Sequence, residues 1–267
     1  MRIGRIGYIN CAPIYGAIDR GIVALPPGGE LVTGTPSELN DLLIAGELDV
    51  SVISAIEYAR HAKDLLLLPD LAISCDGPVR SVALFAKNPV SELSNRTVLL
   101  SASSRTSVAL LELLCREVWK IRPKFAEARA EAPDLEALAS LPHEAVLVIG
   151  DAALQLAAAG TYPHRYDLGE EWKRWTGLPF VFAVWAARRV ASHAAVQRGH
   201  QALLDSRTWG LAHLDDLAAE AARKTGVPVA MCREYLSGLD YAFTGTHRAA
   251  VSDFLRRAGG PQFMQVA

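Results

Sequence analysis

Long apolar runs and clustered cysteines are both missing from this sequence. The four cysteines are scattered over 267 residues and none stands in a C-x-x-C pair, which argues against a disulfide framework and a zinc site. No charge-free apolar stretch reaches the roughly 18 residues that a membrane span needs, and no secretory signal precedes the first strand-like segment. We therefore expect a cytoplasmic protein with reduced thiols and no membrane partner.

Concentrated positive charge is also absent. The 27 lysines and arginines are balanced by 29 aspartates and glutamates, which gives a net charge of −2. Nucleic-acid-binding proteins usually carry a basic face, so we expect no nucleic-acid partner. An anionic ligand would have to be held by local hydrogen-bond donors, since the chain has no general positive field.

The signatures of several common chemistries are missing as well. The sequence contains no G-x-S-x-G, no P-loop and no G-x-G-x-x-G, so serine hydrolases, nucleotide phosphates and dinucleotides lack support. Its seven histidines show no spacing typical of metal ligands, such as H-E-x-x-H. We therefore expect no metal site.

What the sequence does contain is an alternation of strand-like and helix-like segments up to about residue 187, followed by helices over 190–259. One helix is expected to begin where Thr35 can cap and Glu38 completes a capping box, and to end at Gly46. Alternation of this kind is typical of mainly parallel sheets with helices on both faces. The sequence therefore predicts an α/β protein.

The length favours two such sheets, each in its own lobe. The apolar segments Ser81–Lys87 and Phe180–Ala187 are expected to cross between the lobes. Lobe I would then comprise residues 1–86 and 186–267, and lobe II residues 87–185. Ligands of α/β folds bind near the carboxyl ends of strands and the amino ends of helices, so we expect a ligand in the cleft between the lobes.

A hydroxyl-rich turn before a helix is the strongest candidate for an anion-binding site. The segment 101–107 reads S-A-S-S-R-T-S, and an apolar-periodic helix begins within it. The first-turn N–H groups of a helix attract anions, and Arg105 offers a charged fork for a carboxylate. Additional hydroxyls come from Ser103, Ser104, Thr106 and Ser107. Plain capping by Ser103 or Ser104 is an equally good explanation, although a cap needs only one hydroxyl.

Three further polar residues lie where strands meet turns or helices. Asn10 follows the first strand, where its amide can bind a ligand, although a simple turn role is favoured. Ser81 opens an apolar strand at the expected crossover, so its side chain can face the cleft. Asp151 follows the strand Ala145–Ile149, and capping of the next helix is favoured over a carboxylate that faces the ligand.

Several motifs, taken in order, resemble those of one known family. They read R-I-G-Y-I-N-C-A-P from residue 5, C-D-G-P-V-R-S from residue 75, S-R-T-S-V from residue 104, I-G-D-A-A-L from residue 149 and W-T-G-L-P-F-V-F from residue 175. From residue 2 to about residue 257, the chain is similar to the chorismate dehydratases of the futalosine route to menaquinone. Each motif alone is weak, but the ordered set is specific.

The resemblance implies a two-lobed fold like that of class II periplasmic binding proteins, with the ligand in the interlobe cleft. It also implies that chorismate loses water to give 3-[(1-carboxyvinyl)oxy]benzoate, without a cofactor or metal. Asn10 and Ser81 match the family's active-site positions. The segment from Ser104 to Ser107 would line the anionic end of the ligand in the other lobe.

The sequence offers no clear general base for the ring proton of chorismate. No histidine is placed as a general base and an amide is too weak a base, so we expect the substrate's own enolpyruvyl carboxylate to accept the ring proton. Asn10 and Ser81 would orient that carboxylate. Two alternatives remain: a solute-binding or sensor protein of the same fold, and the sister enzyme of the pathway, which acts on a nucleoside-derived intermediate.

Overall fold

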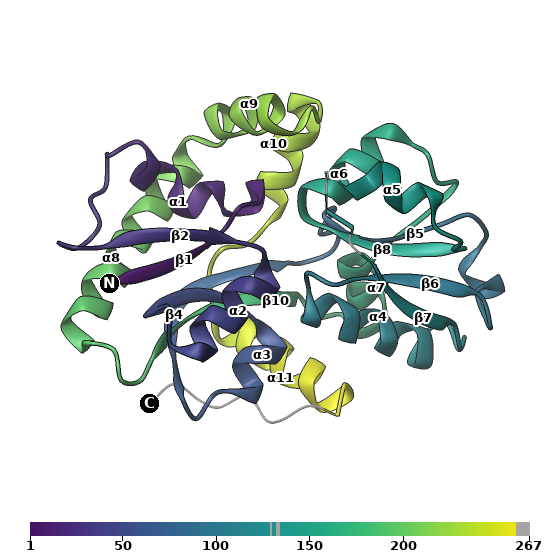
Figure 1. Cartoon of the computed structure of the whole chain (residues 1–267), viewed down its shortest axis with the longest axis horizontal. Helices are drawn as coiled ribbons and strands as arrows, with labels where there is room; N and C mark the ends of the chain where they lie inside the picture. Colours follow the sequence, from purple (N-terminus) through teal and green to yellow (C-terminus); the bar gives the residue numbers. More distant parts are fainter. Residues whose placement is uncertain (129, 132–133, 260–267) are drawn as a thin grey trace.

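The computed structural model describes residues 1–128, 130–131 and 134–259. Two five-stranded sheets lie side by side along the long axis of the molecule (Figure 1). The first sheet has the order β2-β1-β3-β10-β4 and consists of β1 (Arg2–Ile6), β2 (Glu30–Gly34), β3 (Val50–Ser54), β4 (Leu65–Cys75) and β10 (Phe180–Arg188). The second has the order β7-β6-β8-β5-β9 and consists of β5 (Val82–Ala86), β6 (Thr97–Ser101), β7 (Lys124–Ala128), β8 (Ala145–Ile149) and β9 (His164–Asp167).

Helices accompany both sheets (Figure 1). Those of lobe I are α1 (Ala12–Asp19), α2 (Pro36–Ala45), α3 (Ala55–Arg60), α8 (His193–Ala212), α9 (Leu214–Thr225), α10 (Val229–Gly238) and α11 (Gly245–Arg257). Those of lobe II are α4 (Arg105–Glu117), α5 (Leu135–Ser140), α6 (Gly150–Ala159) and α7 (Leu168–Thr176). Short 3-10 turns are η1 (Ile9–Cys11) and η2 (Val90–Glu92). Within the described ranges, no helix combines the length and the hydropathy needed to cross a bilayer.

The two sheets share one topology. In the first sheet, β1 lies between β2 and β3 and is parallel to both, and β10 is antiparallel to its neighbour β3. In the second sheet, β6 lies between β7 and β8 and is parallel to both, and β5 is antiparallel to its neighbour β8. The antiparallel strand is β10 in the first sheet and β5 in the second, and each also pairs with the edge strand on its other side. The expected α/β architecture with two lobes is therefore confirmed.

The expected lobe boundaries are wrong by a few residues at each crossing. All of β5 lies in the second sheet and all of β10 lies in the first, so the chain crosses at residues 76–81 and 177–179. Residues 260–267 of the expected lobe I lie outside the described part. An apolar run cannot reveal which sheet a strand joins, because a strand covered on both faces is apolar in either sheet.

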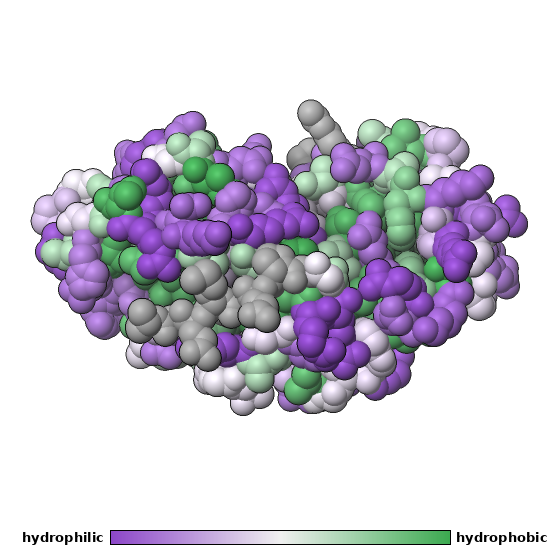
Figure 2. Space-filling view, turned by 90° about the horizontal axis from the view of Figure 1, so that it is seen from below, coloured by the Kyte–Doolittle hydropathy of each residue, from purple (hydrophilic) through white to green (hydrophobic). Residues whose placement is uncertain are grey.

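The core explains why these strands are so apolar. Val82, Leu84 and Ala86 of β5 belong to a large cluster that also contains the first sheet, whereas Ala83 and Phe85 belong to a second cluster on the opposite face. Successive side chains of a strand point to opposite faces, so both faces of β5 are buried. On the outside, seen from below in Figure 2, hydrophilic side chains prevail over lobe I, and apolar ones reach the surface at several places over lobe II.

The helix predicted after β2 is present with the predicted ends. Thr35 Oγ1 accepts from the Glu38 N–H at 3.4 Å, and the Glu38 carboxylate accepts from the Thr35 N–H at 2.8 Å. The helix ends at Gly46, whose φ of +86° suits glycine. The capping-box prediction is confirmed, and this helix, α2, brings Asn40 and Asp41 toward the second lobe.

Candidate active site

The carboxyl ends of strands from both sheets meet around one cavity. The cavity is narrow, with a volume of about 60 Å³. All the residues that line it within the described part are uncharged, and its polar members come from both lobes. These are Tyr8, Asn10, Asn40, Ser54, Ser81, Ser104 and Ser107. The cavity can therefore hold a ligand by hydrogen bonds but not by ion pairs.

Asn10 lies on η1, directly after β1, and lines the cavity. Its Oδ1 is buried and has no hydrogen-bond partner among the described residues. Buried polar atoms in proteins are nearly always hydrogen-bonded, so an unpaired acceptor in a cavity wall indicates a ligand that donates to it. This arrangement favours a binding role for Asn10 over turn chemistry alone.

The neighbouring Cys11 contributes packing rather than chemistry. Its side chain is buried, and burial raises the pKa of the thiol to about 12. The reactive form of cysteine is the thiolate, which a thiol with this pKa does not populate at neutral pH. Cys11 is therefore a packing residue.

Ser81 lies at the start of β5, and its backbone is fully engaged. Its N–H donates to the Val79 carbonyl at 2.8 Å, and its carbonyl accepts from the Gly150 N–H at 2.7 Å. The hydroxyl oxygen accepts from the Tyr235 hydroxyl at 2.8 Å. Because the side chain also lines the cavity, Ser81 is a rigidly placed polar group at the junction of the lobes.

A buried carboxylate holds the turn that presents Ser81. Arg80 has a φ of +64°, a conformation that non-glycine residues rarely adopt. Asp167 accepts from the Arg80 N–H at 2.6 Å and from the Val79 N–H at 3.0 Å. The same carboxylate caps α7 by accepting from Gly169 and Glu170. Asp167 therefore stabilises the strained backbone next to Ser81.

Position 150, whose N–H donates to the Ser81 carbonyl, can hold only a glycine without strain. Gly150 has a φ of +63°, and a Cβ placed on it would lie 2.7 Å from the Tyr8 ring. The Tyr8 hydroxyl donates to both carboxylate oxygens of Glu131 at 2.7 and 2.9 Å. Burial, together with the charge of Glu131, raises the pKa of Tyr8. Tyr8 therefore joins the lobes as a neutral wall of the cavity.

The residues of the serine-rich turn at 103–107 either cap α4 and line the cavity or contact lobe I. Ser104 caps α4: its Oγ accepts from the Ser107 N–H at 3.3 Å and donates to the Ser107 Oγ at 2.8 Å. Both serines line the cavity. Thr106 is fully buried and its Oγ1 accepts from the Ile56 N–H of lobe I at 3.2 Å, while Ser103 lies beside the Tyr8 hydroxyl. The capping interpretation is confirmed for Ser104, and of these residues Ser104 and Ser107 line the cavity.

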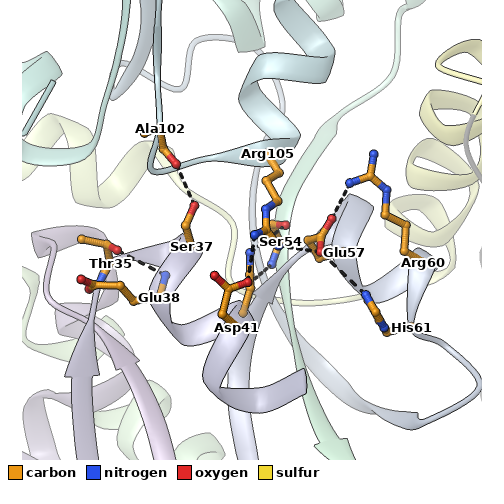
Figure 3. Close-up of polar contacts among 11 residues, drawn as sticks. Thr35, Ser37, Glu38, Asp41, Ser54, Glu57, Arg60, His61, Ala102 and Arg105 are labelled. Atoms are coloured by element: carbon orange, nitrogen blue, oxygen red, sulfur yellow. Dashed lines mark hydrogen bonds and ion pairs between the residues drawn. The ribbon is translucent and has the colours of Figure 1, made fainter. Parts of the chain in front are cut away.

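Arg105 is paired with protein carboxylates in this structure. Its guanidinium reaches from the start of α4 to two carboxylates of lobe I, Glu57 at 2.7 Å and Asp41 at 2.8 Å (Figure 3). It lies in the wall of a separate surface hollow together with Asp41. Arg105 is therefore not among the residues that line the cavity, because α2 and α3 bring protein carboxylates to its guanidinium, and its binding of a ligand carboxylate stays a prediction.

The two ion pairs of Arg105 differ in burial, which leads to a prediction. The side chain of Glu57 is 4% exposed and that of Asp41 is 63% exposed. We expect a double-mutant cycle of Arg105→Ala with Glu57→Gln to give a coupling of about 1 kcal/mol or more in the free energy of unfolding. The matched cycle with Asp41→Asn should give less than about 0.5 kcal/mol. Equal couplings in urea unfolding would contradict this assignment.

Asp151 does not cap α6, which was the favoured interpretation. The N-cap of α6 is Ile149, and the Asp151 carboxylate accepts instead from the Ile9 N–H of lobe I at 2.9 Å. Its other oxygen lies 3.8 Å from the Lys224 Nζ. Asp151 therefore connects α6 to the segment that carries Asn10 and does not cap the helix, and a role in ligand binding stays a prediction.

The protonation of Asp151 gives stability a testable pH dependence. Burial raises the pKa of Asp151 above 3.8 despite the opposing Ile9 N–H and Lys224. A raised folded-state pKa means that the neutral acid favours folding, and this contribution is lost as the pH rises through that pKa. We expect the free energy of unfolding of Asp151→Asn, relative to wild type, to increase from about pH 4 to about pH 7. A decrease in urea titrations would contradict this.

Asn40 and Ser54 are cavity residues that sequence reasoning missed. The Asn40 Nδ2 donates to the Ser54 Oγ at 3.3 Å, and the Asn40 Oδ1 accepts from the Ser54 N–H at 3.1 Å. Both residues are buried. The position of Ser54 at the carboxyl end of β3 was an available signal, whereas Asn40 stands on an ordinary amphipathic helix.

Similar solved structures define the class of fold. A protein of Archaeoglobus fulgidus aligns with a TM-score of 0.80 and 19% identity over 97% of this chain and 96% of its own. The alkanesulfonate-binding protein of Xanthomonas axonopodis pv. citri, solved with bound MOPS, aligns at 0.68 and 15% over 97% and 93%. A Candida albicans protein with the generic periplasmic-binding-protein fold aligns at 0.69 and 12% over 97% and 90%. The chain therefore has the periplasmic-binding-protein fold, as expected.

Sequence comparison identifies the family within this fold. A family model described as menaquinone biosynthesis matches residues 1–259. The chorismate dehydratase of Thermus thermophilus is 33% identical over 274 aligned positions, which cover 97% of this chain and 95% of that protein. The chorismate dehydratase of Campylobacter jejuni is 33% identical over 68% of this chain and 66% of that protein. This chain belongs to the menaquinone-biosynthesis family.

Proposed function

We propose that the chain is a chorismate dehydratase, which removes water from chorismate to give 3-[(1-carboxyvinyl)oxy]benzoate for menaquinone biosynthesis. Support comes from its family and from a relative of that name that is 33% identical over 97% of the chain. The observation that carries the proposal is that Asn10 and Ser81, which belong to separate motifs, line the same uncharged cavity.

Chorismate carries two carboxylates, and the cavity offers neutral donors in both lobes. The amino end of α4 bears partial positive charge, and Ser104 and Ser107 stand there in the cavity wall. Across the cavity, the buried pair Asn40 and Ser54 provides further polar groups. Hydrogen bonds to ionised acceptors are shorter and stronger than neutral ones, so such donors can hold a dianion without a cation.

The reaction needs a base for a ring proton and help for the departing hydroxyl. The lining residues include no carboxylate or histidine among those described, so we propose that the substrate's enolpyruvyl carboxylate accepts the proton. In this proposal the Asn10 Nδ2 donates to that carboxylate, the unpaired Asn10 Oδ1 accepts from the reacting hydroxyl, and Ser81 hydrogen-bonds the same hydroxyl. Loss of water makes the ring aromatic without any change of oxidation state in a partner, so the proposed reaction uses no cofactor.

Ultraviolet spectroscopy tests the proposal. Purified protein is mixed with a large excess of chorismate, and the conversion of the cyclohexadiene to a benzoate is followed over time. We expect many turnovers and a product lighter than chorismate by one water. A spectral change limited to one equivalent would indicate a binding protein, and an unchanged spectrum would favour the sister enzyme with its nucleoside-derived substrate.

A further inference from the structure

Ser81 is held by a tyrosine that comes from a different part of the chain. Tyr235 lies on α10, is 1% exposed, and donates from its hydroxyl to the Ser81 Oγ at 2.8 Å. Burial raises the pKa of Tyr235 well above its ordinary value, so the phenol stays protonated. A phenol that cannot ionise acts only as a hydrogen-bonding group.

The direction of this hydrogen bond follows from what else surrounds the phenol. Ser81 is the only hydrogen-bond partner of the Tyr235 hydroxyl within the described residues. A buried O–H without an acceptor is costly, so the single phenolic proton goes to the Ser81 oxygen. The hydrogen of Ser81 must then point elsewhere.

The remaining bonds of Ser81 determine where that hydrogen can go. The Ser81 N–H and carbonyl are engaged by Val79 and Gly150. The hydroxyl hydrogen is the one polar hydrogen of Ser81 without a partner in the described structure, and the residue lines the cavity. Ser81 therefore presents a donor to the ligand.

We propose that Tyr235 is a positioning residue, which fixes Ser81 as a hydrogen-bond donor to the reacting hydroxyl of chorismate; this inference rests on the proposed function. In the elimination, the ring C–H bond breaks, its proton passes to the enolpyruvyl carboxylate and its electron pair forms the new ring double bond. The electron pair of the C–O bond leaves with the hydroxyl oxygen, which takes that proton back from the carboxylic acid to become water. A donor at that oxygen stabilises the transition state more than the bound substrate.

Helix α10 touches the same turn at a second point that serves as a control. Glu234, the neighbour of Tyr235, pairs with Arg80 at 2.6 Å, but its side chain is 64% exposed. Exposed ion pairs of this kind contribute little to the stability of the fold. Removal of the Glu234 charge therefore breaks a contact between α10 and the turn without removing the hydrogen bond to Ser81.

The variant Tyr235→Phe removes the hydroxyl and keeps the buried ring. We expect kcat for chorismate to fall roughly tenfold with KM changed by less than about threefold, because the lost interaction acts in the transition state. Tyr241→Phe is the matched control, since Tyr241 is 2% exposed and its hydroxyl has no partner among the described residues. Tyr241→Phe and Glu234→Gln should each change kcat by less than about twofold.

A double variant separates positioning from general damage. In a Ser81→Ala background, Tyr235→Phe should cost less than about twofold in kcat, because no hydroxyl remains to be positioned. A further tenfold loss in that background, or full activity of Tyr235→Phe alone, would overturn the inference. If the wild type does not convert chorismate, the proposed function fails instead, so the two outcomes are distinguishable.

Discussion

Replacement of Asn10 or Ser81 by alanine should lower kcat for chorismate by roughly a hundredfold, equivalent to about 2.7 kcal/mol in the transition state. Asn10 provides a buried acceptor that has no partner among the described residues, and Ser81 provides a donor whose position is set by three hydrogen bonds. The measurement is turnover at saturating chorismate.

A matched control for these variants is Ser206→Ala. Ser206 is as buried as Ser81, but its Oγ accepts from the Ala17 N–H at 3.2 Å, in the contact between α1 and α8. We expect Ser206→Ala to reduce stability and to leave kcat within about twofold. A loss smaller than about tenfold in both Asn10→Ala and Ser81→Ala would refute the roles assigned to these residues.

The largest expected effect on stability is that of Asp167→Asn. The carboxylate is 6% exposed and accepts from the backbone N–H groups of Val79 and Arg80 on one side and of Gly169 and Glu170 on the other. The amide keeps one acceptor but turns an NH₂ group toward N–H donors. We expect a loss of about 3 kcal/mol in the free energy of unfolding, together with a lower kcat because the turn before Ser81 relaxes.

Urea unfolding and chorismate turnover measure the two consequences of Asp167→Asn. Asp134→Asn is the control, because Asp134 also stands at a helix N-cap but its side chain makes no capping bond. That variant should lose less than about 0.5 kcal/mol. A loss below about 1 kcal/mol for Asp167→Asn would show that the buried carboxylate is not what holds the turn.

Much of the fold could be predicted because it depends on neighbours in the chain. The capping box at Thr35 and Glu38 is a short-range pattern and is present as predicted. A cap at Ser103 or Ser104 was one of two interpretations, and the structure places it at Ser104. The apolar strands β5 and β8 were recognised from their composition. The sheet to which β5 belongs was not predicted, because a strand that is buried on both faces has the same apolar composition in either sheet.

The candidate site was predictable in part for a related reason. Asn10, Ser81 and Ser104 stand at junctions of strands with turns or helices, and these junctions gather where the carboxyl ends of parallel strands meet. Asn40 and Tyr235 lie in the middle of helices, where a polar residue usually faces solvent. Only packing against Ser54 and Ser81 makes them part of the site.

Taken alone, the sequence determined the alternation of elements and several of their caps, because these follow from local spacing and composition. The partners of Arg105 and Asp151 were decided only by the tertiary structure. A charged group at the start of a helix suits a ligand and an opposing protein group equally well. Which of the two it meets depends on segments far away in the chain, here α2 and α3 for Arg105 and η1 for Asp151.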